Sequence, residues 1–215
     1  GVTEPNSGLN TLALSTTATP TANGHSIFGQ KIWISSAQVA DNMILLARTK
    51  ALEDCKKPSE GLSLFFIPLN KSDPALKLSR IPKMGACAID ANEVFFDGYQ
   101  IPESSLIGKE GEGFKIAMSA LDNGRFTVAA GAVGLSIACL EASVKYSKER
   151  QTFGKEIGRH QLVQQMIAKM EAGLQMSCLL VYRVGELKNK GVRNTRETSL
   201  AKWQACDFAN KAADD

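Results

Sequence analysis

Two groups of polar side chains between positions 122 and 161 have residue types suited to ligand binding. The first is Asp-Asn-Gly-Arg at 122–125, which we expect to form a charged turn. The second is Arg-Gln-Thr-Phe at 150–153, with His-Gln following at 160–161. An arginine can hold a phosphate with two parallel hydrogen bonds, but an isolated arginine is equally a surface cation at a helix end or an ion-pair partner.

A stretch of small residues, Ala-Ala-Gly-Ala at 129–132 followed by Gly134, separates the two groups. Its composition predicts a helix. Glycine in a helix interior costs roughly 0.8–1 kcal/mol relative to alanine. We therefore expect another backbone or a flat ligand to approach Gly131 and Gly134 closely, with a tight helix–helix contact as the simpler form of that arrangement.

Other common catalytic arrangements are disfavoured by the cysteine and histidine content. The five cysteines are scattered, with no CxxC pair and no histidine at ligand spacing, so we expect reduced, mostly buried thiols and neither zinc nor disulfides. The two histidines are His25, beside a predicted turn, and His160. A Ser-His-Asp triad is hard to assemble from them, which argues against hydrolase chemistry.

The overall composition, with 44% hydrophobic and 22% charged residues, is ordinary for a soluble globular protein. A net charge of +3 without a dense basic run argues against nucleic-acid binding. We see no apolar run approaching the ~20 residues of a membrane span, and so expect none.

The elements that must position these side chains follow two different patterns. Residues 11 to about 100 contain short β-prone runs punctuated by prolines, with a type I′ turn expected at Asn23-Gly24. The expected strands cover 12–17, 27–36, 43–48, 62–68, 75–81 and 93–96. This grouping predicts a compact antiparallel barrel or sandwich.

Beyond Pro102 the pattern becomes helical. Glycines at 108, 111 and 113 indicate a hinge, and apolar residues then recur at helical spacing. One stripe runs from Val163 to Cys178, and another from Ala201 to Ala212. We therefore predict an α+β protein, with a β domain at 1–104 and an incomplete bundle of three long antiparallel helices at 105–215. Gly1 lies inside a predicted binding loop and Asp215 inside a helical pattern, so we expect an internal portion of a longer protein.

The combined pattern GR…AAG…G…Y…ERQTFGKEIG…Q, together with Val-Thr-Glu-Pro at 2–5, resembles the acyl-CoA dehydrogenase family over essentially the whole chain. The resemblance implies a middle β-barrel domain, a C-terminal helical bundle and FAD as the cofactor. It also implies α,β-desaturation of an acyl-CoA thioester, in which a glutamate takes the α-proton and a hydride leaves the β-carbon for flavin N5.

The resemblance assigns flavin-binding roles to three segments. Val2, Thr3 and Glu4 correspond to the loop along the flavin ring. Trp33, Ile34 and Ser35 correspond to the second ring contact, although Trp33 taken alone is more simply a core residue. The loop that reaches a neighbouring subunit's FAD corresponds to Arg150, Gln151, Thr152 and Phe153, with His160 and Gln161 on the same side.

The substrate side of the resemblance has two departures. Asp122, Asn123, Gly124 and Arg125 match the acyl-CoA-contacting segment, but Gly8-Leu9-Asn10 stands where the family usually has Gly-Ser-Asp. Leu9 therefore occupies a substrate-contact position without its hydroxyl. Some branches also carry the catalytic glutamate where this chain has Gly124, so the resemblance implies no catalytic residue in this chain and a base beyond Asp215. No metal is implied.

Two alternatives to an acyl-CoA dehydrogenase remain open. A flavin oxidase or monooxygenase can use the same scaffold, and a non-catalytic member could bind flavin or acyl-CoA without a base. The family resemblance further implies a homo-oligomer, a dimer of dimers that forms a homotetramer, with an electron-transfer flavoprotein or similar acceptor. A bacterial cytoplasmic or mitochondrial matrix location follows from the same resemblance.

Overall fold

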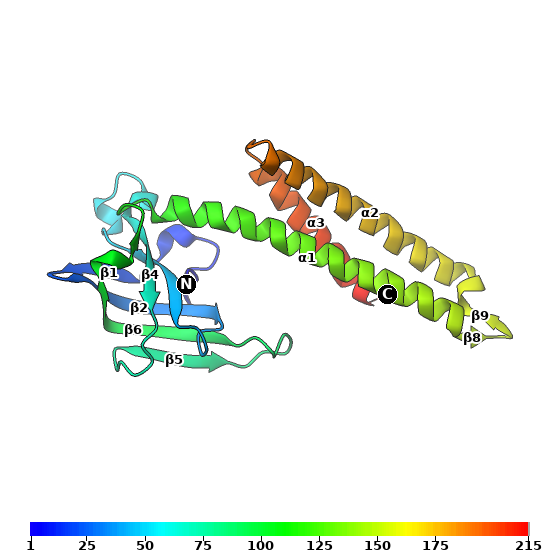
Figure 1. Cartoon of the computed structure of the whole chain (residues 1–215), viewed down its shortest axis with the longest axis horizontal. Helices are drawn as coiled ribbons and strands as arrows, with labels where there is room; N and C mark the ends of the chain where they lie inside the picture. The colour runs from blue at the N-terminus through cyan, green and yellow to red at the C-terminus, as the bar shows by residue number, and fades with distance from the viewer. Residues whose placement is uncertain (215) are drawn as a thin grey trace. The chain divides into compact units, whose positions relative to one another are not determined.

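The computed structural model describes residues 1–214 of the chain, which fall into two compact units. The first comprises Gly1–Met118 and holds a β-sheet; the second begins at Ser119 and is helical (Figure 1). A sheet and helices that occupy separate parts of the chain confirm the predicted α+β class.

The sheet has seven strands in the order β5-β6-β2-β1-β3-β4-β7. All neighbouring strands pair antiparallel except β1 and β3, which share one parallel contact. The strands are β1 (Thr17–Thr21), β2 (Gly24–Ser35), β3 (Asn42–Arg48), β4 (Leu62–Pro68), β5 (Leu76–Ile81), β6 (Ala91–Pro102) and β7 (Leu106–Ile107). Short 3₁₀ helices cover Thr11–Ala13, Leu52–Asp54, Pro58–Gly61, Glu103–Ser105 and Ile157–Arg159.

The structure departs from the predicted strands at the N-terminal side of β1. Residues 12–16 do not extend β1; Thr11–Ala13 forms a 3₁₀ turn instead. The reason is that a carboxylate occupies the backbone donors at this point: Glu4 accepts hydrogen bonds from the N–H groups of Ser15 and Thr16. The predicted β1–β2 hairpin is present, but Ala22 and Asn23 are its central residues and neither has a positive φ, so the turn is not type I′.

The larger of two core clusters in the first unit lies on one face of this sheet. It is built from side chains that alternate along the strands, as period-two patterning requires. Its members include Ile27, Leu45, Phe65, Ile67, Val94 and Tyr99. A second cluster joins Leu14, Leu46, Leu62 and Leu64 to the N-terminal end of helix α1 (Gly113–Glu149) through Ala117. The start of α1 is fixed there, because a Cβ on Gly113 would lie 2.4 Å from the backbone of β4.

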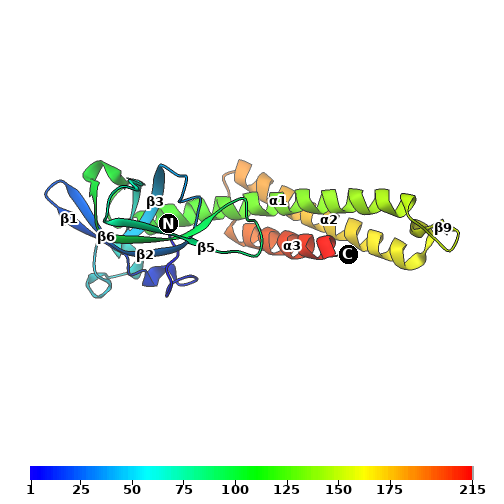
Figure 2. The same cartoon turned by 90° about the horizontal axis from the view of Figure 1, so that it is seen from below.

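Three long helices lie side by side in the second unit, as predicted (Figure 2). After α1 come α2 (Gln161–Asn189) and α3 (Thr195–Asp214). The predicted apolar stripes face inward: Met170 and Leu174 of α2 are buried, as are Ala201 and Ala205 of α3. Between α1 and α2, β8 (Gln151–Thr152) and β9 (Lys155–Glu156) form a small hairpin.

Two features of α1 correct the sequence analysis. Residues 122–125 form no turn but continue the helix, which an i,i+3 ion pair between Asp122 and Arg125 supports. Helix α1 is also long and apolar enough to cross a membrane by length and composition alone, because no charged residue occurs from 126 to 140. Those criteria do not separate a membrane span from a bundle helix, and Ala129 packs against α2 and α3.

Two further expectations concern buried contacts. A Cβ added at Gly131 or Gly134 meets nothing within 4 Å in residues 1–214, so no backbone of the described chain makes the predicted close approach, and an approach by a ligand or another chain stays a prediction. Among the cysteines, Cys87 is exposed and the other four are half-buried, so the thiols are less buried than expected. All five are free in the described structure.

Candidate functional site

The segment that precedes the first strand is fastened to the sheet by its backbone. The carbonyl of Gly1 accepts a hydrogen bond from the N–H of Leu46 in β3, at 3.0 Å. The carbonyl of Thr3 accepts one from the N–H of Ile32 in β2, at 2.9 Å. Val2 and Thr3 are half-buried. The Val2-Thr3 segment therefore lies beside β2 at Ile32, the residue directly before Trp33.

The side chain of Glu4 points away from solvent and is held by four hydrogen bonds. Its carboxylate accepts from the N–H and hydroxyl of Ser15, both at 2.7 Å, and from the N–H of Thr16 at 2.9 Å. The Nζ of Lys31 donates to it at 2.8 Å and to the carbonyl of Val2 at 3.1 Å. The Glu4 and Lys31 side chains are 3% and 0% exposed, so neither head group is available to a ligand.

Burial and pairing act on these two charges in opposite directions. Desolvation alone raises the pKa of Glu4, but the charge of Lys31 and the hydrogen bonds from Lys31, Thr16 and Ser15 outweigh it and lower the pKa to about 2. Desolvation is the larger effect on Lys31 and lowers its pKa to about 8, although Glu4 opposes this. Both groups therefore carry their charges at neutral pH.

Strand β2 contains a bulge at Trp33. Lys31 pairs with Val94 and Ile34 with Asn92, so two residues of β2 stand opposite one residue of β6. Trp33 has φ of 62°, a left-handed conformation that costs a bulky residue on the order of 1–3 kcal/mol. Its side chain is nevertheless 57% exposed, which excludes the interpretation of Trp33 as a core residue within this unit.

The bulge is held from its other side by a buried asparagine. The amide of Asn92 donates to the carbonyl of Ile34 at 3.0 Å, and Asn92 accepts from the side chain of Gln38 at 2.9 Å. Ile34 is half-buried, whereas Ser35 is exposed like Trp33. The three residues of this predicted contact thus present an aromatic face and a hydroxyl to solvent from a fixed backbone.

In the second unit, the hairpin after α1 brings together most of the second predicted cofactor group. Phe153 and Gly154 have φ of 53° and 75°, the conformation of a two-residue hairpin turn with positive φ at both positions. This turn leaves Phe153 96% exposed. The hydroxyl of Thr152 lies 3.1 Å from Nε2 of His160, and the rings of Phe153 and His160 are 6.2 Å apart, edge to face.

Arg150, Gln151 and Gln161 border this hairpin and are exposed. Arg150 directly follows α1, and its backbone exchanges hydrogen bonds with Tyr146 and Ile157, each at 2.9 Å. The hairpin thus presents a cation, an aromatic ring and amide side chains on one protrusion. This set fits the phosphate and ring portions of a dinucleotide.

The predicted substrate residues of α1 are engaged in polar contacts inside the second unit. Asp122 accepts from Arg125 at 2.6 Å and from the hydroxyl of Thr195 at 2.9 Å. Asn123 accepts from Lys188 at 2.8 Å. The ion pair that the sequence left as an alternative role for Arg125 is therefore present, while 41% exposure leaves its side chain accessible to a ligand. Gly124 is exposed, and so is Leu9 in the first unit.

Comparison with known proteins identifies the family of the chain. The profile described as "Acyl-CoA dehydrogenase, middle domain" matches residues 1–99. That described as "Acyl-CoA dehydrogenase, C-terminal domain" matches residues 111–215. The chain belongs to the acyl-CoA dehydrogenase family.

Similar members and structures share this portion of their chains. Glutaryl-CoA dehydrogenase of Desulfococcus multivorans is 37% identical over 214 residues, covering 99% of this chain and 54% of that protein. A chain from the solved electron transferring flavoprotein of Acidaminococcus fermentans has a TM-score of 0.92 and 36% identity, covering 100% of this chain and 55% of that one. PigA with FAD and proline has a TM-score of 0.91 and 30% identity, covering 98% and 54%. The chain spans about half the length of the relatives it matches.

Sequence analysis missed two buried residues that hold the proposed flavin-contacting segments: Lys31, which bonds Val2 and Glu4, and Asn92, which bonds Ile34. Lys31 could have been found, because period-two alternation from the core residue Ile27 places it on the inward face of β2. A lysine on an inward face requires a partner. That its partner is Glu4 could not be read from the sequence, since the two are 27 residues apart. Asn92 gave no comparable signal.

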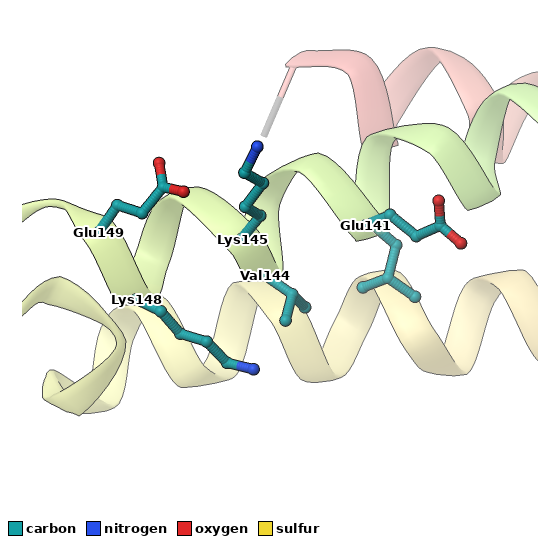
Figure 3. Close-up of a pocket in the computed structure, with 6 residues that line it drawn as sticks. Glu141, Val144, Lys145, Lys148 and Glu149 are labelled. Carbon is teal, nitrogen blue, oxygen red and sulfur yellow. The ribbon is translucent and has the colours of Figure 1, made fainter.

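One hollow in the structure has none of these residues in its lining. It is lined by α1 residues alone, among them Glu141, Val144, Lys145, Lys148 and Glu149 (Figure 3). None of these lining residues is among the predicted cofactor or substrate residues. Because a single helix face provides no opposing wall, the hollow is not a candidate for the active site.

Proposed function

We propose that this chain is the middle and C-terminal portion of an FAD-dependent acyl-CoA dehydrogenase that desaturates an acyl-CoA thioester. The observation that carries the proposal is Trp33, an exposed aromatic residue in a strained backbone conformation beside the segment at Val2-Thr3. Backbone strain concentrates at functional sites, where the surrounding structure holds it in place. The family supports the cofactor class, and PigA, a structural relative, is described with FAD.

The residues present fit FAD in two places. The face of Trp33, the hydroxyls of Thr3 and Ser35 and the backbone at residues 2–4 would hold the ring system. The exposed Arg150 and Phe153, with Gln151, Thr152, His160 and Gln161 around them, would hold the phosphate and adenine portion of a neighbouring subunit's FAD. When bound, FAD supplies the two-electron acceptor that desaturation requires.

The substrate proposed is an acyl-CoA, in line with the name of the glutaryl-CoA dehydrogenase relative. Arg125 would bind the pantetheine or nucleotide part of the acyl-CoA, and the ion pair with Asp122 would hold the Arg125 side chain in place. Asn123 and Gly124 are further proposed substrate contacts of the second unit, and Leu9 is a proposed substrate contact of the first. Gly124 has no side chain that could take a proton, so we place the catalytic glutamate beyond Asp215.

A second function on the same scaffold is favoured by one comparison. PigA, which shares the fold, is described with proline rather than a CoA ester. Leu9 also stands where the family usually has a serine, so the serine hydroxyl expected near the thioester is absent. An FAD-dependent oxidase or monooxygenase is therefore the second candidate, and reactivity of its reduced flavin with oxygen distinguishes it from a dehydrogenase.

The assembly, partner and location proposed follow from the same relatives. We propose a homotetramer made of two dimers, in which the Arg150 hairpin serves the neighbouring subunit. An electron-transfer flavoprotein is the proposed acceptor, a class represented by the Acidaminococcus fermentans structure. The proposed location is the bacterial cytoplasm or the mitochondrial matrix.

The test of this function uses the full-length parent protein. We expect a yellow protein with about one FAD per subunit, whose flavin bleaches anaerobically with at least one member of an acyl-CoA panel. Rapid reoxidation of the bleached flavin by air identifies the oxidase alternative. A folded parent that stays colourless after incubation with FAD rules out both flavin functions, and FAD that no acyl-CoA bleaches rules out the dehydrogenase.

The role of the hairpin is tested by Arg150→Ala in the same parent. Loss of a charge-assisted hydrogen bond should weaken FAD binding by about 1.5–3 kcal/mol, measured by fluorescence titration. Arg159→Ala is the matched control, since Arg159 is an exposed arginine nearby whose ion pair is with Glu156. Equal FAD affinity in both variants contradicts the proposed contact.

A further inference from the structure

A buried ion pair lies directly beneath the proposed flavin contact. Glu4 and Lys31 are joined at 2.8 Å with side chains 3% and 0% exposed. Taking two charges out of water usually costs more than burying an apolar pair of the same volume, so such a pair is weak evidence of added stability. The presence of this pair in a small sheet core therefore points to a role other than stability alone.

The partners of the pair come from three separate segments. Glu4 belongs to the N-terminal loop, Ser15 and Thr16 to the approach to β1, and Lys31 to β2. The Nζ of Lys31 also donates to the carbonyl of Val2, at 3.1 Å. The network thus fixes the height and orientation of residues 2–4 relative to β2 through charge-assisted hydrogen bonds, which are directional.

The same network adjoins the strained backbone of the bulge. Ile32, which follows Lys31, donates its N–H to Thr3. Trp33 comes next, in its left-handed conformation. A bulky residue keeps such a conformation only while its surroundings hold it. Lys31 on one side and Asn92, bonded to Ile34, on the other are the side chains that brace this backbone.

We infer that the Glu4–Lys31 ion pair is a positioning device that holds the Val2-Thr3 segment against the Trp33 bulge and thereby shapes the flavin-binding surface. The inference rests on the proposed FAD function. Neither residue is a catalytic residue, because both head groups are buried and cannot touch a ligand. Glu4 accordingly acts through the backbone of residues 2–3, not through a direct contact of its carboxylate with FAD.

The test compares three variants of the full-length parent. Glu4→Gln and Lys31→Met each remove one charge, and the double variant removes both without leaving a lone buried charge. Glu186→Gln is the matched control: it makes the same chemical change at an exposed carboxylate that pairs with Arg183 and Lys190 on α2. The readouts are the Kd for FAD, the visible spectrum of bound flavin and hydrogen exchange at the Ile32 amide.

The inference predicts that each single variant raises the Kd for FAD at least tenfold and alters the flavin spectrum, while the control stays within twofold. Exchange of the Ile32 amide should accelerate at least tenfold in the FAD-free variants, because its hydrogen bond to Thr3 opens. The double variant should regain thermal stability without regaining FAD affinity. A merely structural pair would not separate stability from affinity in this way.

Two results overturn the inference: FAD affinity and spectrum within twofold of wild type in the folded variants, or unchanged Ile32 exchange. If a single variant does not fold, the double variant decides by the same criteria. A wild-type parent that binds no FAD overturns the proposed function instead. In that case the Ile32 exchange of the FAD-free proteins still reports whether the ion pair holds the loop.

Discussion

The bulge in β2 and the small-residue stretch of α1 combine residue type and backbone conformation in opposite ways. At the bulge a tryptophan adopts the left-handed conformation that usually falls to glycine. In α1, Gly131 and Gly134 occupy helical positions where a Cβ would meet nothing within 4 Å of the described chain. Both regions therefore give up local stability, one through strain and the other through poor helix propensity.

The two regions differ in what compensates this local loss. At the bulge the compensation is visible within the first unit, in the Glu4–Lys31 pair, the Thr3–Ile32 hydrogen bond and the Asn92 brace. Along α1 no contact in residues 1–214 accounts for the two glycines. The conformation of the bulge can therefore be explained by contacts within the first unit. The glycines of α1 cannot be explained by contacts within the described chain.

The largest effect should come from removing Glu4. Glu4→Gln leaves Lys31 as an unpaired buried charge, which we expect to lower the free energy of unfolding by about 3–5 kcal/mol at neutral pH. The folded-state pKa of Glu4, about 2, lies below its ordinary 4.5. The difference between these two pKa values corresponds to about 3 kcal/mol of stability from the ionised carboxylate. This stability is fully present above pH 4.5 and is lost as the pH falls toward 2.

Urea unfolding of wild type and Glu4→Gln between pH 7 and pH 2 measures this dependence. The gap between the two proteins should narrow as the pH falls from 4.5 toward 2. A gap that stays constant over that range would show that the carboxylate charge does not stabilise the first unit.

A smaller effect should distinguish two kinds of glycine in the helices. A Cβ at Gly173 of α2 would lie 2.1 Å from the ring of Phe208 in α3. Gly173→Ala should therefore destabilise by about 1–3 kcal/mol through overpacking. Gly131→Ala meets no such contact and should stabilise by up to about 1 kcal/mol through helix propensity.

Thermal unfolding of the two alanine variants in the parent protein tests this difference. Equal shifts of Tm would contradict the packing of Phe208 over Gly173. A loss of stability in Gly131→Ala would sharpen the comparison, because it would show that another chain or segment supplies the close approach that residues 1–214 lack.

The smallest effect on stability should come from Trp33→Gly. Glycine adopts the conformation at φ 62° without strain, and this gain offsets the lost contacts and the added freedom of the unfolded chain. We expect the free energy of unfolding to change by less than about 1 kcal/mol. FAD affinity should nonetheless fall more than tenfold, as fluorescence titration would show; an unchanged affinity would remove Trp33 from the flavin site.

Sequence patterns predicted the elements more completely than their connections. The apolar stripes of α2 and α3 and five of the seven large-sheet strands follow from periodicity, which depends on neighbours close in the chain. The helical course of residues 122–125 was missed because Asp, Asn and Gly together favour turns, while the contact of Asp122 with Thr195 spans 73 positions.

For the candidate site, local sequence patterns identified the exposed residues that would contact a ligand. They did not identify the buried residues that hold the exposed ones in position. The resemblance singled out Trp33 and the Arg150 hairpin by their spacing, but the bulge beneath Trp33 depends on register with β6. Lys31 and Asn92 matter through bonds to residues far along the chain, and only the folded sheet brings these together. The hairpin turn was likewise placed one residue too late and given the wrong type, since Ala22 and Asn23 form it without positive φ and Gly24 serves the close approach to β6.

The pairing of β2 with β6 also orders the steps by which the first unit folds. The β1–β2 hairpin closes a short loop, whereas the bond between Asn92 and Ile34 closes one of 58 residues. Loop-closure entropy delays contacts of this kind, so we expect β2 to pair with β6 after the β1–β2 hairpin has formed. Trp33 lies at the bulge of this ladder and is one of two tryptophans in the chain, so its fluorescence can report the pairing of β2 with β6.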